Sequence, residues 1–200
     1  MTRLVLVRHG ESTWNAAGRW QGHADPPLSP LGERQAADAA EHAQGVEAVW
    51  TSDLARARRS AEIIAGLRGL GVRVEPGLRE RDAGEWQGLT RTEIEQLWPG
   101  YLGSGRRPPG FEGDEALLAR ALAAITEIGA AHRGESVLVV THGGVVRTLE
   151  RHLGAEDRGL LPNLGGRVLE LGRPGRNGVW TLGPRVLLLE GVTVTRPEQI

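Results

Sequence analysis

The sequence contains no cysteine and no lysine. Without cysteine the protein has no disulfides, thiol nucleophiles or thiolate-bound metal clusters. Without lysine it has no Schiff-base amine and no P-loop lysine, which excludes most pyridoxal and P-loop mechanisms. All 24 basic residues are therefore arginine. Genomic base composition is the simplest reason for this choice, but arginine is also the better bidentate ligand for phosphate.

The sequence also lacks a charge excess and a long hydrophobic run. The formal net charge is −1, which gives no reason to expect a nucleic acid or an anionic membrane as a partner. The apolar run at residues 4–7 is too short for a signal peptide or a membrane span, and we expect a cytoplasmic protein. With 200 residues, 40% of them hydrophobic, the chain is predicted to form a single domain over residues 1–200.

The sequence contains three apolar runs. Each run ends in polar residues and is followed by a helical pattern. The runs cover residues 4–7, 46–51 and 137–141, and the helices expected after them cover residues 31–43, 54–67 and 145–153. Ser29 and Pro30 form a typical start for the first of these helices. Strands that alternate with helices predict an α/β fold with a parallel sheet.

The remaining elements are shorter. We expect a strand at residues 72–74, a helix from the capping box of Thr90 and Glu93 to Leu97, a flexible loop at residues 99–113 and a helix from a cap at Asp114 to about His132. Residues 11–28 are expected to form a structured loop. Short strands are predicted at residues 168–171, 179–182 and 185–189. They either pack at a sheet edge or pair between subunits, so the sequence is consistent with both a monomer and a homodimer.

The polar residues that follow the three main strands are predicted to meet, because the carboxyl ends of parallel strands lie at one sheet edge. Arg8 and His9 follow the first strand, Ser52 and Arg56 the second, and His142 the third. Arginines and helix N-termini at one edge suit a phosphoryl group, and they can supply charge stabilisation in place of a metal ion. A single histidine at the end of a strand is more often structural, so the argument depends on this convergence.

Five blocks of sequence, in order, resemble the histidine phosphatase superfamily, which includes cofactor-dependent phosphoglycerate mutases and small broad-specificity phosphatases. They are residues 6–12 with Trp14 and Asn15, residues 27–32 with Gln35 and Ala36, residues 51–54 with Arg56 and Ala57, residues 78–81 with residues 84–86, and residues 140–144. The resemblance implies a three-layer α/β/α sandwich with a mainly parallel central sheet, similar to phosphoglycerate mutase.

The resemblance also implies a role for each matching residue. His9 is the expected nucleophile, which would form a phosphohistidine intermediate. Glu80 is the expected proton donor to the leaving alcohol and the later base for water, although a solvated salt-bridge cluster is the alternative for this charged segment. The phosphoryl oxygens are expected to bind Arg8, Arg56 and His142, with Asn15 as an additional contact.

Further candidates are less specific. Gln21 and Gly22 in the loop after the first strand are candidate substrate-binding residues, as are Arg106 and Arg107, for which a solvated loop is the alternative. His23, His42, His132 and His152 do not share metal-ligand spacing. We expect no metal and no cofactor.

The departures from the family favour its phosphatase branch. Cofactor-dependent mutases carry a longer insertion after the proton donor and a lysine in the substrate pocket, and this chain has neither. We therefore expect a metal-independent phosphomonoesterase that hydrolyses a small phosphorylated metabolite. A cofactor-dependent phosphoglycerate mutase is the alternative, because Trp14 with Asn15 and the Arg106–Arg107 pair resemble that part of the family. A non-catalytic module that binds phospho-ligands is a further alternative, although no expected catalytic position is substituted.

Overall fold

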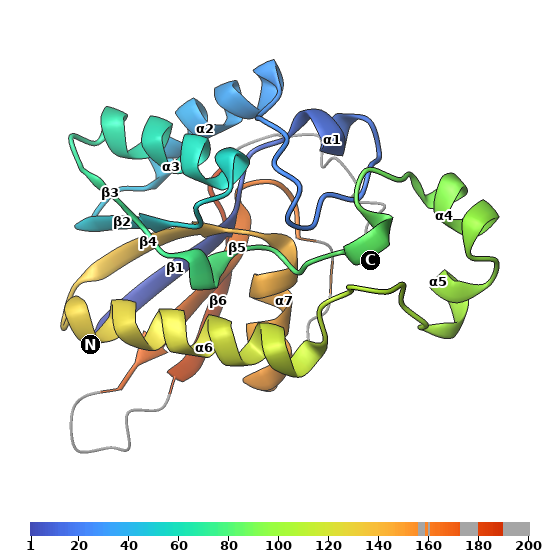
Figure 1. The fold of residues 1–200 in the computed structure, drawn as a ribbon. Coiled ribbons are helices and arrows are strands. Elements are labelled where there is room, and N and C mark those ends of the chain that lie inside the picture. Colours follow the sequence, from blue (N-terminus) through green and yellow to red (C-terminus); the bar gives the residue numbers. More distant parts are fainter. Residues whose placement is uncertain (156–158, 160, 173–179, 190–200) are drawn as a thin grey trace.

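The fold is built on a six-stranded sheet. The structure is a computed structural model that describes residues 1–155, 159, 161–172 and 180–189. Across the described part of the sheet the strand order is β3-β2-β4-β1-β5-β6 (Figure 1). The strands are β1 (Thr2–Arg8), β2 (Ala48–Thr51), β3 (Val72–Val74), β4 (Ser136–Thr141), β5 (Gly165–Leu171) and β6 (Trp180–Leu187).

The four strands from β3 to β1 are parallel, β5 pairs antiparallel with β1, and β6 pairs antiparallel with β5. In the register of β1 with β4, Arg8 lies opposite Thr141. The two strands therefore end level, so the residues that follow each strand, His9 and His142, leave the sheet side by side. The predicted mainly parallel sheet is confirmed.

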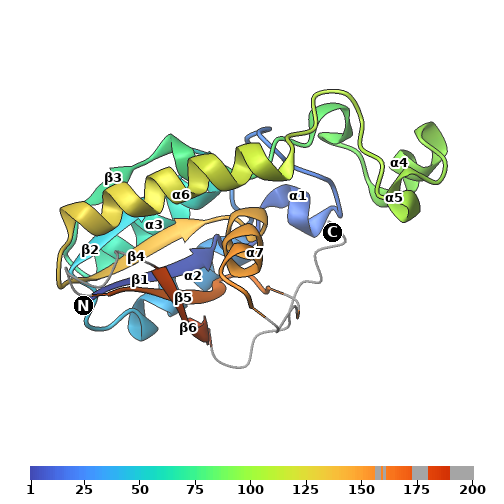
Figure 2. The same cartoon turned by 90° about the horizontal axis from the view of Figure 1, so that it is seen from below.

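Helices cover both faces of the sheet. On one face lie α2 (Pro30–His42) and α3 (Ala55–Leu67), and on the other lie α6 (Asp114–Ala131) and α7 (Gly143–His152) (Figures 1 and 2). Alternate residues of a strand point to opposite faces, and in β1 both sets are apolar: Leu4 and Leu6 pack with α6 and α7, while Val5 and Val7 pack with α2 and α3. Each face has its own apolar core, as the predicted three-layer sandwich requires.

Two of the predicted helix starts are confirmed by their capping hydrogen bonds. Ser29 accepts a hydrogen bond from the Gly32 N–H at 3.0 Å at the start of α2. Thr90 and Glu93 form the predicted capping box of α4 (Arg91–Leu97). These caps satisfy backbone N–H groups that have no partner inside the helix.

The segment predicted as a structured loop at residues 11–28 contains a short helix, α1 (Thr13–Ala16). It is one turn long and held by a capping box between Ser12 and Asn15, and such a short helix leaves no periodic signal in the sequence. The predicted loop at residues 99–113 likewise contains α5 (Tyr101–Ser104). Together α4 and α5 stand away from the sheet, beyond the carboxyl ends of the strands (Figures 1 and 2).

Two sequence predictions need correction. Asp114 is the first residue of α6, and the cap position belongs to Gly113, which makes no side-chain hydrogen bond. The strands predicted at residues 179–182 and 185–189 are one continuous strand, β6, which ends at Leu187, so Leu188 and Leu189 follow it; Val179 lies outside the described residues. Gly183 and Pro184 suggested a turn, but β6 is the last of the described strands, and proline is tolerated where one side of the backbone pairs with no other described strand.

Within the described ranges, no helix combines the length and the apolar character needed to cross a bilayer.

Candidate active site

His9 and His142 form the centre of the site, at the ends of β1 and β4. Both are buried, and their ring centroids are 5.1 Å apart. His9 Nδ1 lies 2.6 Å from the carbonyl oxygen of Gly10. Because a carbonyl only accepts hydrogen bonds, Nδ1 carries the proton of the neutral ring and Nε2 keeps its lone pair. The backbone of His9 is also fixed, since the Asn163 side chain donates to its carbonyl at 2.9 Å.

The surroundings of the two histidines favour their neutral forms. The pKa of His9 lies well below its usual value because of burial first, and then because of the positive charges of Arg56 and Arg8. The pKa of His142 is also lowered well below its usual value, first by burial and then by the positive charge of Arg56. At neutral pH the lone pair of His9 is therefore available for nucleophilic attack.

Arg8 and Arg56 bring two buried cations to the histidines. Arg8 donates to the carbonyl of Leu161 at 3.1 Å, and Arg56 donates to those of Gly22 and Ala24, both at 2.8 Å. Burial lowers the pKa of each guanidinium to about 10, so both stay charged at neutral pH.

Neither of these guanidiniums forms an ion pair with a carboxylate within the described part of the chain. Among the described residues, Arg56 Nε and both ring nitrogens of His142 are also buried without hydrogen-bond partners. Buried polar groups normally have partners, so these atoms indicate a ligand that accepts hydrogen bonds and carries negative charge.

Glu80 faces the same cavity from the segment after a 3₁₀ turn at Pro76–Leu78. Its carboxylate accepts hydrogen bonds from the backbone N–H groups of Arg81, at 2.8 Å, and Gly144, at 3.1 Å. The second of these N–H groups belongs to the first turn of α7, where the helix leaves such donors free. Glu80 is thereby held at the end of the sheet that carries His9.

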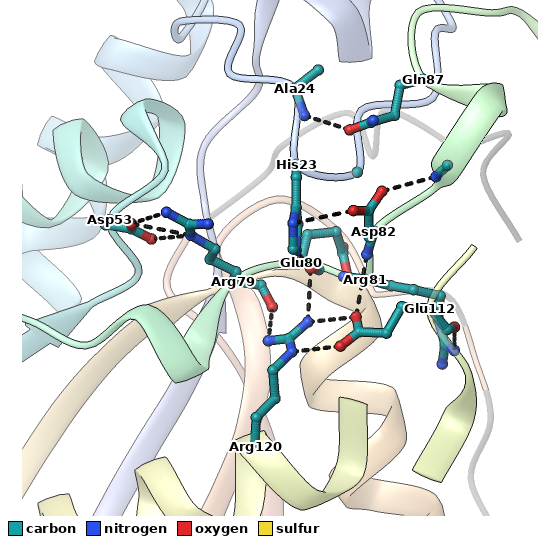
Figure 3. A network of polar contacts seen from close by, with 12 residues as sticks. His23, Ala24, Asp53, Arg79, Glu80, Arg81, Asp82, Gln87, Glu112 and Arg120 are labelled. Carbon is teal, nitrogen blue, oxygen red and sulfur yellow. Dashed lines mark hydrogen bonds and ion pairs between the residues drawn. The ribbon is translucent and has the colours of Figure 1, made fainter. Parts of the chain in front are cut away.

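A polar network behind Glu80 fixes the backbone of this segment (Figure 3). Arg120 on α6 donates to the carbonyls of Gly77, Arg79 and Glu80 at 2.5 to 2.9 Å, and its guanidinium forms two hydrogen bonds of 2.7 Å with Glu112. His23 Nε2 lies 2.8 Å from the carbonyl oxygen of Glu80. The charged residues of this segment therefore belong to an ordered network.

The other candidate residues fall into two groups. Gln21, Gly22 and Arg107 line the cavity with His9 and Glu80, and Arg107 packs over the rings of Trp86 and Phe111. Two of these candidates lie outside the cavity lining, and His142 lies just behind it, next to the lining residues His9 and Gly143. Asn15 is buried in the capping box of α1, and Arg106 lies over the ring of Tyr101 on the exposed surface.

The cavity has a volume of about 650 Å³. Its wall includes six charged residues absent from our sequence-based site, and these are Arg81, Glu112, Asp114, Arg147, Glu150 and Arg151. Of these, Arg147 follows Gly143 by four residues on α7 and so lies on the same face of the helix. Helical spacing from the His142 motif places Arg147 on this face of α7 but does not distinguish its role from that of other helix residues. Among the described residues, no cluster of three or more histidine or acidic side chains could hold a metal ion.

The neutral histidine, the two buried arginines and the carboxylate across the cavity define an α/β protein with a phosphoryl-transfer site. The sequence model of the histidine phosphatase superfamily (branch 1) matches residues 4–170. The chain belongs to this superfamily.

Similar proteins carry names that indicate different activities. Phosphoglycerate mutase-like protein 4 of Arabidopsis thaliana is 42% identical over 157 residues, which cover 73% of this chain and 68% of that protein. The metal-independent phosphoserine phosphatase of the same plant is 39% identical over 183 residues, with coverages of 86% and 77%. The structure of a mycobacterial glucosyl-3-phosphoglycerate phosphatase in complex with VO3 has a TM-score of 0.80 and 31% identity, and the match covers 90% of this chain and 96% of that one.

Proposed function

We propose that this protein is a metal-independent phosphomonoesterase that hydrolyses small phosphorylated metabolites through a phosphohistidine intermediate on His9. One observation carries the proposal. The Nδ1–H of the buried His9 is bonded to the Gly10 carbonyl, and this leaves Nε2 as a nucleophile beside the buried cations of Arg8 and Arg56.

In the first step, the phosphoryl oxygens bind the guanidiniums of Arg8 and Arg56 and a ring nitrogen of His142. The lone pair of His9 Nε2 attacks phosphorus, and the bond from phosphorus to the ester oxygen breaks. The Glu80 carboxyl group gives its proton to that oxygen, so the alcohol leaves without a negative charge. The two arginines offset the charge that spreads over the phosphoryl oxygens in the transition state.

In the second step, water replaces the alcohol. The Glu80 carboxylate, which now lacks its proton, removes a proton from the water as the water oxygen attacks phosphorus. The bond from phosphorus to Nε2 breaks, its electron pair returns to His9, and inorganic phosphate leaves. The two steps together regenerate the starting enzyme.

A hydrolase is favoured over a mutase because the sequence has no lysine and only a short segment after Glu80. The phosphatase names of two of the relatives also support it. Phosphoglycerate mutase activity is the second candidate, favoured by the 42% identical mutase-like relative. A mutase would pass the phosphoryl group from His9 to a second position of the substrate, whereas a hydrolase passes it to water.

The experiment follows 3-phosphoglycerate, O-phosphoserine and p-nitrophenyl phosphate with the purified protein in chelator. We expect release of inorganic phosphate from at least one of them, and loss of that release in His9→Ala. His42→Ala, which replaces an exposed histidine at the end of α2, is the matched control and should keep full activity. Formation of 2-phosphoglycerate without phosphate release would favour the mutase, and full activity of His9→Ala would contradict the proposal.

The single domain over residues 1–200, the cytoplasmic location and a homodimer remain predictions from the sequence. The Asn15 contact with the phosphoryl group and the substrate contacts of Gln21, Gly22, Arg106 and Arg107 remain predictions as well.

A further inference from the structure

Arg147 lines the cavity next to the expected phosphoryl pocket. It lies one turn into α7 from Gly143, and its Nη2 atom is 3.7 Å from the point where a Cβ on Gly143 would stand. Arg8 Cδ is also 3.7 Å from that point. The side chains of Arg147 and Arg8 therefore lie close to each other, near the N-terminal turn of α7.

Arg147 differs from the other arginines of the cavity wall because no described residue forms a hydrogen bond or an ion pair with it. Arg81 and Arg151 both pair with Asp114, and Arg107 packs over two aromatic rings. Burial lowers the pKa of Arg147, while the negative charge of Glu80 acts in the opposite direction. A half-buried cation without a counter-ion is destabilising unless a ligand supplies one.

We propose that Arg147 is a specificity-determining residue that binds a carboxylate on the alcohol part of the substrate. The inference rests on the proposed function, since it assumes that the ester oxygen lies at Glu80. Glu80 and Arg147 line the same cavity, and Arg147 lies beside Arg8. We therefore expect a carboxylate one or two carbons from the ester carbon to reach the guanidinium while the phosphoryl group stays on Arg8 and Arg56.

A carboxylate fits this position better than a second phosphate. Arg147 offers one planar guanidinium, and its parallel N–H groups match the two oxygens of a carboxylate. The phosphoryl pocket, in comparison, uses two arginines and two histidines for one phosphate. The remaining arginines of the described wall are engaged with Asp114 or with aromatic rings, so they are not free to complete a second pocket of that kind.

The test measures binding, so it does not depend on turnover. Two ligands form a matched pair: 3-phosphoglycerate carries a carboxylate where glycerol 3-phosphate carries a hydroxymethyl group. Calorimetry compares them on His9→Ala and on the double variant His9→Ala/Arg147→Gln. We expect His9→Ala to bind 3-phosphoglycerate about 10- to 100-fold more tightly than glycerol 3-phosphate, the range expected for a charge-assisted hydrogen-bonded pair. The double variant should lose this preference.

Several outcomes would overturn the inference. They are the absence of a preference in His9→Ala, its persistence in the double variant, and an equal loss of affinity for both ligands in the double variant. A third variant, His9→Ala/Arg147→Lys, keeps the charge but not the planar fork, and it should retain part of the preference. Thermal unfolding of each variant identifies a folding defect. Phosphate release by the wild-type protein tests the proposed function separately, so failure of one does not imply failure of the other.

Discussion

The carboxylate of Glu80 lies against the backbone of Gly144. The Gly144 N–H donates to Glu80 Oε2 at 3.1 Å, and a Cβ added to Gly144 would stand 2.1 Å from Glu80 Oε1. Since real Cβ atoms do not approach an oxygen that closely, only glycine at this position allows the carboxylate to rest on the first turn of α7.

Replacement of Gly144 by alanine should therefore displace the Glu80 carboxylate. For a substrate with a poor leaving group, such as 3-phosphoglycerate, we expect kcat to fall about 100-fold, within the range that a positioned general acid contributes. Steady-state phosphate release measures the change. Gly66→Ala is the matched control, because nothing lies within 4 Å of the added Cβ on α3. Wild-type activity of Gly144→Ala would contradict the contact.

Replacement of Glu80 by glutamine removes the proton donor and keeps the size of the side chain. For 3-phosphoglycerate, whose alcohol is a poor leaving group, we expect kcat to fall about 100- to 10,000-fold. For p-nitrophenyl phosphate, the phosphorylation of His9 should slow much less, because p-nitrophenolate leaves without a proton. Single-turnover release of p-nitrophenol measures this step. Equal losses in the first step for both substrates would show that Glu80 is not the acid.

Arg120 should act as a positioning residue for Glu80. Arg120→Met removes three contacts with backbone carbonyls and the ion-pair partner of Glu112, and we expect a loss of about 3 kcal/mol in the free energy of unfolding. In the folded variant kcat should fall, while KM for the phosphorylated substrate should change little. Urea unfolding and steady-state kinetics measure the two effects. Arg58→Met, which breaks an exposed pair with Glu62 on α3, should change neither by much.

The buried histidines predict a pH dependence of stability. The pKa values of His9 and His142 lie below the usual value in the folded state, so the unfolded chain binds more protons as the pH falls below about 6.5. The free energy of unfolding should therefore fall from about pH 7.5 to about pH 5.5. Bound phosphate should reduce this loss, because its negative charge favours the protonated rings.

Urea unfolding with and without phosphate at the two pH values measures this effect. The same series with His9→Asn should show a smaller dependence on pH, because one of the two buried imidazoles is gone. A wild-type stability that does not change over this range would contradict the neutral state of the two rings.

The sequence was sufficient for the parts of the fold and site that depend on local patterns. Apolar runs and helix caps predicted β1, β4 and α2, and the level ends of parallel strands brought Arg8, His9 and His142 together as expected. The short helices α1 and α5 were not predicted, because a single turn has no periodic pattern.

The roles of Arg120 and Arg147 could not be predicted in the same way. Arg120 acts on backbone carbonyls about 40 residues earlier in the chain, and nothing near it in the sequence distinguishes it from the exposed Arg133. Arg147 is distinguished by the absence of a partner among the described residues, and only three-dimensional structure shows this. Long-range polar contacts of this kind leave no local signal.

The proposed mechanism depends most on transfer of the phosphoryl group to His9 Nε2. Rapid quenching in base, followed by peptide mass spectrometry during turnover of p-nitrophenyl phosphate, tests it most directly. We expect a phosphoryl group on His9 that is stable in base and labile in acid, and that is absent from His9→Ala. Turnover with no phosphoryl group on the protein, or with one on a different residue, would contradict this mechanism.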